Sequence, residues 1–239
     1  MNRAQYGAAL AALPLDGIAA YLSANSGLPG PRANLTLLDA AGDVLPRDLA
    51  LEFTARPDEY LACCGTVAVG RLIVEGDRAL TGRLTELAAD QRWRVREATA
   101  IAAQRIGDAE PALLRSLVAV WVTDPDPLVV RAGIAAICEP RLLAEPATAA
   151  VAVAACQQAT AALLATPASH RRDAGVRTLR QALGYCWSVA MAGDPVLGLP
   201  AFRALDTTDP DLAWIDRENR KKKRLAPFAA ELEPDPQLG

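Results

Sequence analysis

The chain has 239 residues, of which 51% are hydrophobic and 22% are charged, and its formal net charge is −3. This composition is too apolar for a disordered chain, and the length suffices for one sizeable domain or an elongated repeat array. Alanine, the best helix former, supplies roughly one residue in five. Since no alternating strand pattern bounded by hairpin turns is present, we expect an all-α fold.

Helix starts are marked by proline. Between residues 110 and 210, proline follows an acidic residue seven times: Glu110-Pro111, Asp124-Pro125, Asp126-Pro127, Glu139-Pro140, Glu145-Pro146, Asp194-Pro195 and Asp209-Pro210. An acidic residue at the N-cap accepts hydrogen bonds from unpaired backbone N–H groups, and proline at the first helical position loses none. We therefore interpret these dipeptides as helix starts.

In chain order, the sequence predicts twelve helices, at residues 15–25, 34–42, 46–56, 58–75, 77–89, 92–106, 110–122, 126–138, 146–165, 171–191, 195–206 and 210–224. The loop at 26–34 contains two glycines and two prolines, and Asn34 is a candidate N-cap. Paired in order, the helices give about six antiparallel hairpins in one domain, residues 1–226. Residues 227–239 are acidic and contain proline, so we expect them to form a flexible tail.

Two stretches of the chain share one pattern. Asp90 precedes Val95-Arg96 and an alanine-rich apolar run, and Asp124 likewise precedes Val130-Arg131. The two arginines are 35 residues apart, which is the length of one helical hairpin. A repeat of this length predicts stacked hairpins, because a single hairpin cannot bury its apolar face alone.

These stretches resemble the bacterial HEAT-repeat proteins, in which the second helix of each hairpin begins with an Asp-x-Asp-x-x-Val-Arg pattern. The match is best within residues 85–139 and 205–225, roughly a third of the chain. The resemblance implies an α-solenoid of about six HEAT-like helix pairs. It also implies that Arg96, Arg131 and Arg217 bond acidic side chains or carbonyls of the neighbouring repeat.

Lysine occurs only at Lys221, Lys222 and Lys223. Residues 217–224 carry six positive charges and one negative charge, so this segment has a net charge of +5 and the remainder has −8. In one interpretation, the cations complement the C-terminal end of the last helix. In the other, Arg217, Lys221 and Arg224 share a helical face and contact the phosphates of a nucleic acid or another polyanion.

Three of the four tryptophans, Trp93, Trp121 and Trp214, are placed near predicted hairpin turns, whereas Trp187 belongs to an apolar helix and is expected in the core. A tryptophan at a turn usually fills a gap between helices. DNA alkylation-repeat glycosylases offer an alternative at the level of fold, since they are also built from HEAT-like hairpins. In that family, aromatic faces and a carboxylate stabilise a cationic damaged nucleotide. By this analogy, Trp121, Asp124 and Asp126 are candidate catalytic residues.

Other catalytic, phosphate-binding and metal-binding motifs are absent from the sequence. It contains no Gly-x-Ser-x-Gly motif, no phosphate-binding glycine loop and no histidine pair at ligand spacing. The single histidine, His170, is expected in a polar turn. We predict buried free thiols, and neither a metal nor a cofactor, from the five cysteines Cys63, Cys64, Cys138, Cys156 and Cys186.

The function predicted from these features is that of a non-enzymatic interaction module. It would present an extended surface to a protein or polyanionic partner; we expect a protein first, and nucleic acid through 217–224 as the alternative. No membrane partner is expected, because the most apolar segment, 147–166, is mostly alanine, and we expect a cytoplasmic location. The candidate binding residues are Arg32, Trp93, Arg94, Arg131, Trp214, Arg217, Lys221, Lys222, Lys223 and Arg224.

Overall fold

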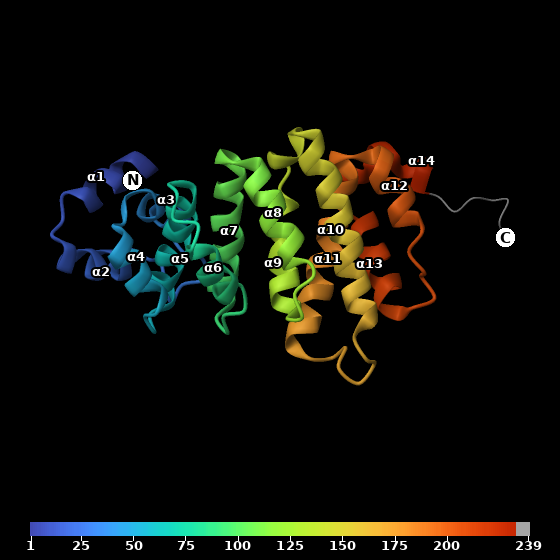
Figure 1. Cartoon of the computed structure of the whole chain (residues 1–239), viewed down its shortest axis with the longest axis horizontal. Helices are drawn as coiled ribbons and strands as arrows, with labels where there is room; N and C mark the ends of the chain where they lie inside the picture. The colour runs from blue at the N-terminus through green and yellow to red at the C-terminus, as the bar shows by residue number, and fades with distance from the viewer. Residues whose placement is uncertain (233–239) are drawn as a thin grey trace. The chain divides into compact units, whose positions relative to one another are not determined.

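The computed structural model describes residues 1–232 of the chain (Figure 1). This part consists of α-helices, short 3₁₀ helices and connecting loops, and it contains no strand. The predicted all-α class is therefore confirmed. Contacts within the chain group it into two compact units, Met1–Glu110 and Pro111–Gly239, which we call unit 1 and unit 2. Each unit is described separately below.

Unit 1 is organised around the long helix α5. This helix contacts α2, α3, α4, α6 and α7, and nearly all of its residues are buried. A row of helices is formed by α1, α3, α5 and α7, each in contact with the next. The helices of unit 1 are α1 (Arg3–Ala11), α2 (Leu15–Ala24), α3 (Leu35–Val44), α4 (Arg47–Thr54), α5 (Glu59–Val74), α6 (Leu80–Ala88) and α7 (Trp93–Ala109).

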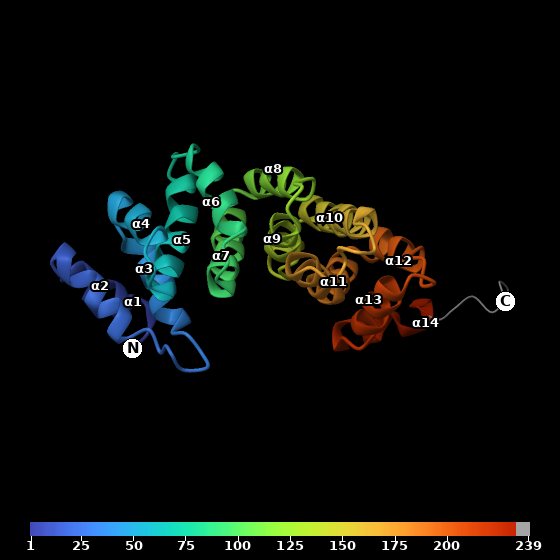
Figure 2. The same ribbon diagram turned by 90° about the horizontal axis from the view of Figure 1, so that it is seen from below.

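Unit 2 has two rows of helices (Figure 2). One row contains α8, α10 and α12, and the other contains α9, α11 and α13, with α11 also contacting α10 and α12. The elements are α8 (Pro111–Trp121), α9 (Pro127–Ile137), the 3₁₀ helix η1 (Leu142–Ala144), α10 (Pro146–Ala165), α11 (Ala174–Gly193), α12 (Pro195–Arg203), α13 (Pro210–Arg220), the 3₁₀ helix η2 (Lys223–Phe228) and α14 (Ala229–Leu232).

All twelve predicted helices are present, and the structure adds α1 and α14. Five of the seven acidic-proline dipeptides start a helix, at Pro111, Pro127, Pro146, Pro195 and Pro210. The other two do not. Asp124 accepts a hydrogen bond from the Asp126 N–H in the turn before α9, and Glu139-Pro140 lies in the turn before η1. The predicted cap at Asn34 is confirmed, because its side chain accepts from the Leu37 N–H.

The start of the predicted acidic tail is helical. Residues 227–228 belong to η2, residues 229–232 form α14, and Leu232 is buried. The Arg220 guanidinium donates to the Leu232 carbonyl, which holds this turn against α13. The remainder of the predicted tail, 233–239, lies outside the described residues.

Helix α10 forms part of the core of unit 2. Among the described helices, it alone is long and apolar enough, by length and composition, to cross a membrane, and half of that stretch is buried within the protein. Trp187 of α11 is fully buried and donates its indole N–H to Thr160 Oγ1 of α10 at 3.1 Å. Its ring packs against Phe202 of α12, with the centroids 5.7 Å apart. The expected core position of Trp187 is therefore confirmed.

Ion pairs join residues that are about one hairpin length apart in sequence. Arg94 of α7 pairs with Glu59 of α5 at 2.9 Å, and Arg78, in the turn before α6, pairs with Glu110 after α7 at 2.7 Å, both within unit 1. In unit 2, Arg171, in the turn before α11, pairs with Asp209, the N-cap of α13. The partners are separated by 32 to 38 residues, so these pairs link segments distant in sequence within each unit.

The contact between α11 and α13 is close and polar at its centre. Asn219 of α13 is fully buried and donates through Nδ2 to the carbonyl oxygens of Leu183 and Ile215, at 2.9 and 2.8 Å. Its Oδ1 accepts the N–H of Ser188 at 2.8 Å. A glycine is needed at position 184, because a Cβ there would lie 2.7 Å from the Trp214 ring. The amide of Asn219 therefore joins the two helices, and Gly184 allows them to approach closely.

We predict that Asn219→Ala lowers the free energy of unfolding by about 1–3 kcal/mol, because it removes the buried hydrogen bonds that join α13 to α11. Denaturant unfolding followed by circular dichroism measures this change. The matched control is Arg217→Ala on the same helix, which removes an exposed side chain and should change stability by less than about 0.5 kcal/mol. Equal stability of the two variants would contradict the role of Asn219.

Candidate anion-binding site

The cationic residues after α13 do not continue that helix. The sequence predicts a helix to residue 224, but α13 ends at Arg220, Lys221 is its C-cap, and Lys222 has an extended backbone. A helix continued to residue 224 would place like charges four residues apart, Arg217 with Lys221 and Arg220 with Arg224, and such pairs destabilise a helix. Arg217, Lys221 and Arg224 therefore do not share one helical face, and that part of the prediction is wrong. We call Lys221–Arg224 the basic segment.

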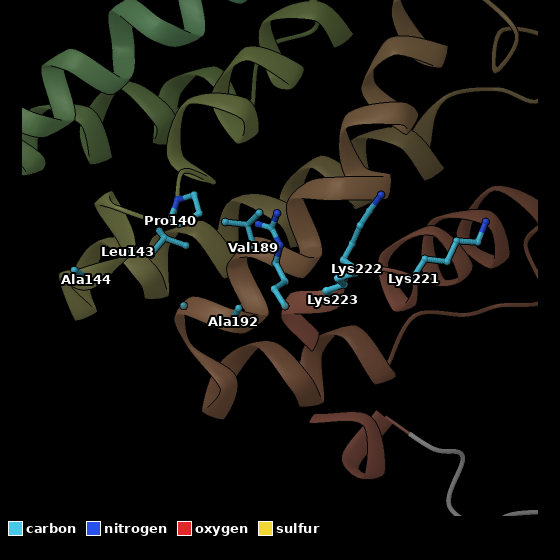
Figure 3. A pocket seen from close by; sticks show the side chains of 10 residues that line it. Pro140, Leu143, Ala144, Val189, Ala192, Lys221, Lys222 and Lys223 are labelled. Carbon is cyan, nitrogen blue, oxygen red and sulfur yellow. The ribbon is translucent and has the colours of Figure 1, made fainter. Parts of the chain in front are cut away.

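The basic segment forms one wall of a cavity in unit 2, with a volume of about 640 Å³. Figure 3 shows the three lysines on one side, Pro140, Leu143 and Ala144 on the other, and Val189 and Ala192 between them. Gly193 and Arg224 complete the lining. Every charged residue that lines this cavity is a cation, so its wall favours an anionic occupant.

The apolar part of the cavity comes from two segments distant in sequence. Leu143 of η1 and Val189 of α11 are buried, with exposed fractions of 6% and 2%. Pro140, Ala144 and Ala192 are exposed at the edge. The cavity therefore has an apolar base and a cationic wall.

Only one cation of the basic segment has a carboxylate partner among the described residues. Lys221 pairs with Glu218 at 2.7 Å, and this hydrogen bond lowers the pKa of the Glu218 carboxyl. Arg224 instead donates to the Tyr185 hydroxyl at 2.7 Å, and the Lys222 ammonium lies 5.7 Å from the centre of the same ring. The exposed Lys223 side chain has no hydrogen bond or ion pair within residues 1–232. Lys222, Lys223 and Arg224 therefore have no ion-pair partner in the described structure, although the charge of Lys222 also acts on the Glu218 carboxylate.

A second hollow borders the basic segment. Its volume is about 350 Å³, and Lys221, Lys222 and Lys223 line it as they line the first cavity. The rest of the lining is Arg220 and the mostly apolar set Leu225, Ala226, Ala229 and Leu232. The lysines therefore separate two hollows, each of which has an apolar part.

Three of the other predicted binding residues, Arg32, Trp93 and Arg94, line a common pocket in unit 1. Its volume is about 350 Å³, and the remaining lining residues are mostly apolar. Trp93 is 53% exposed, and the Arg94 guanidinium lies over its ring at 4.4 Å. Arg94 is also paired with Glu59, so much of its charge is compensated within the protein. This pocket is more apolar than the cavity of unit 2.

The remaining predicted binding residues belong to unit 2 and line none of these pockets. Trp214 packs on α11, with the Arg180 guanidinium 4.0 Å from its ring centre. Arg131 is half-buried in α9 and has interactions within the protein. Arg217 is exposed on α13. For Arg96 in unit 1, the structure places the guanidinium on the carbonyls of Asp90 and Gln91, in the turn before its own helix.

The alternative catalytic set does not form an exposed site. Trp121 is fully buried, so neither face of its indole is open to a nucleotide, which contradicts the stacking role considered for it. Asp124 and Asp126 accept the backbone N–H groups of Asp126 and Leu128 at 2.8 Å. They therefore act as turn and helix caps at the start of α9.

The five cysteines are free and buried, as predicted. Burial raises the pKa of the Cys63, Cys64 and Cys156 thiols, and that of Cys63 rises to about 12. Cys138 and Cys156 are close neighbours, with their sulfurs 3.7 Å apart. His170 lies in an exposed turn beside Asp173. Within residues 1–232, no group of three or more His, Cys, Asp or Glu side chains is placed to hold a metal ion.

No protein-family model, no curated protein and no solved structure matches this chain. The resemblance to HEAT-repeat proteins therefore rests on the sequence pattern.

We predict that the thiols of the folded protein react slowly with Ellman's reagent at pH 8, because the thiolate is the reactive species and burial disfavours it. In guanidinium chloride, all five thiols should react within minutes. A rapid stoichiometric reaction of the folded protein would contradict the burial of these side chains.

Proposed function

We propose that the chain is a binding protein of the HEAT-like helical-repeat type, and that unit 2 binds an anionic group of its partner at the basic segment. The observation that carries this proposal is the cavity whose charged lining residues are all cations. An anion there would meet Lys222, Lys223 and Arg224, none of which is paired with a carboxylate among the described residues. It would therefore gain attraction without breaking an existing ion pair of these three residues.

The helical-repeat part of the proposal has separate support. In unit 2, the rows α8–α10–α12 and α9–α11–α13 alternate along the chain, as they would in stacked hairpins. Ion pairs between residues about one hairpin apart, such as Arg94–Glu59 and Arg171–Asp209, add a regular polar contact. We extend this arrangement to an α-solenoid of about six helix pairs as part of the same proposal.

A protein partner fits the cavity better than a nucleic acid does. Nucleic-acid binding relies on cations distributed along a surface that follows many phosphates. Here the lysines are consecutive and stand over an apolar base formed by Leu143 and Val189. One anionic group beside an apolar side chain matches this geometry. The glycosylase alternative has less support, since Trp121 is buried.

Retention on a heparin column tests the anion-binding role of the basic segment. We predict that the variant K221Q/K222Q/K223Q elutes at clearly lower salt than the wild type. The slope of log affinity against log salt should become shallower by about 2–3, because each cation lost releases one fewer counterion. The matched control is R172Q/R177Q/R203Q, which removes three exposed charges elsewhere in unit 2 and leaves the cavity intact.

The control variant has the same net charge as the lysine variant. It should elute close to the wild type if the cavity is the binding site. Equal losses in the two variants would mean that only net charge matters, and this result would reject the assignment of the site.

A further inference from the structure

We propose that the basic segment recognises a phosphorylated side chain within a partner protein segment that carries aliphatic residues on both sides of the phosphate. This inference deepens the proposed function and rests on it. It specifies the anionic group, the apolar groups next to it and the hollows that receive them.

The charge of the wall matches a dianion better than a single carboxylate. Lys222, Lys223 and Arg224 have no carboxylate partner within the described residues, whereas Lys221 is already paired with Glu218. A phosphate monoester carries a charge of about −1.5 to −2 at neutral pH and offers three acceptor oxygens. A carboxylate carries one charge and two acceptor oxygens. Three cations without an ion-pair partner among the described residues therefore favour phosphate.

The two hollows favour an occupant that continues on either side of the phosphate. The first hollow is the cavity described above, which has a volume of about 640 Å³ and has Leu143 and Val189 at its base. The second, of about 350 Å³, is lined by Leu225, Ala229 and Leu232. Because the lysines line both, a chain segment crossing the basic segment would bring its phosphate to the cations and place apolar side chains in each hollow. A free phosphate would leave both apolar parts empty.

A membrane surface fits these hollows less well than a peptide does. Insertion into a bilayer requires large exposed apolar side chains around the cations. The exposed apolar residues that line the first hollow are Pro140, Ala144 and Ala192, which are small. Leu143 and Val189 are buried at its base and are not placed to enter a bilayer.

The test measures binding of the full chain to a labelled peptide that has a central phosphoserine and a leucine on each side, by fluorescence anisotropy. Three matched peptides replace the phosphoserine by serine, the phosphoserine by glutamate, or both leucines by serine. We expect each replacement to weaken binding about tenfold or more, the equivalent of one charge-assisted hydrogen bond or one buried leucine side chain.

Variants of the protein test each hollow separately. Ala192 and Ala229 are exposed, and each lines one of the two hollows. Ala192→Glu places a carboxylate in the first hollow and should abolish binding, whereas Ala192→Gln, of nearly equal size, should weaken it only a few-fold. The pair Ala229→Glu and Ala229→Gln does the same for the second hollow. Thermal melting of each variant verifies that it is folded.

Equal binding of the phosphoserine and glutamate peptides would overturn the choice of phosphate. If the affinity for the phosphopeptide did not change when its leucines were replaced, or when the protein carried Ala229→Glu, the two-hollow arrangement would be overturned. Tighter binding to vesicles containing anionic lipid, or to single-stranded DNA, than to the phosphopeptide would overturn the peptide in favour of that ligand. If no peptide binds while heparin retention still depends on Lys221–Lys223, this inference fails and the proposed function stands.

Discussion

The candidate site depends on one buried amide. Asn219 is enclosed between α11 and α13, where it bonds the carbonyls of Leu183 and Ile215 and the N–H of Ser188. A buried amide that bonds both helices permits only a narrow range of relative positions, because any shift leaves polar groups unpaired. Lys221 follows two residues later. The amide therefore fixes where the basic segment begins against α11, the helix that also supplies Val189 and Ala192 to the cavity.

The electrostatics of the fold explain why cations are tolerated at this place, but not why three of them lack an ion-pair partner among the described residues. Helix α13 ends at Arg220 and α11 ends at Gly193, and the C-terminal end of a helix attracts positive charge. This effect accounts for some basic residues after α13. Lys221 has a partner in Glu218, whereas Lys222, Lys223 and Arg224 have no ion-pair partner within residues 1–232. The proposal of an external anion rests on these three cations.

The sequence predicted the local features of this fold and missed those that depend on distant contacts. The twelve helices were found because N-caps, proline and apolar periodicity are local signals. Helix α1 was missed although its signal was present, since Asn2 and Gln5 form a capping box. The predicted end of α13 is four residues too late, because apolar periodicity and capping signals do not include the repulsion between like charges four residues apart. The cavity could not be foreseen, since Leu143, Val189 and Lys222 come together only through the packing of three segments.

The two units differ in the chemistry that they offer a partner. In unit 1, the pocket at Trp93 is largely apolar, and Arg94 is compensated by Glu59. In unit 2, the cavity has an apolar base of similar character, but Lys222, Lys223 and Arg224 have no ion-pair partner among the described residues. An apolar group alone would gain free energy in either pocket, because burial is favourable wherever water is displaced. The cavity of unit 2 would in addition favour a group that carries negative charge, and this difference is the basis of the proposed anionic partner.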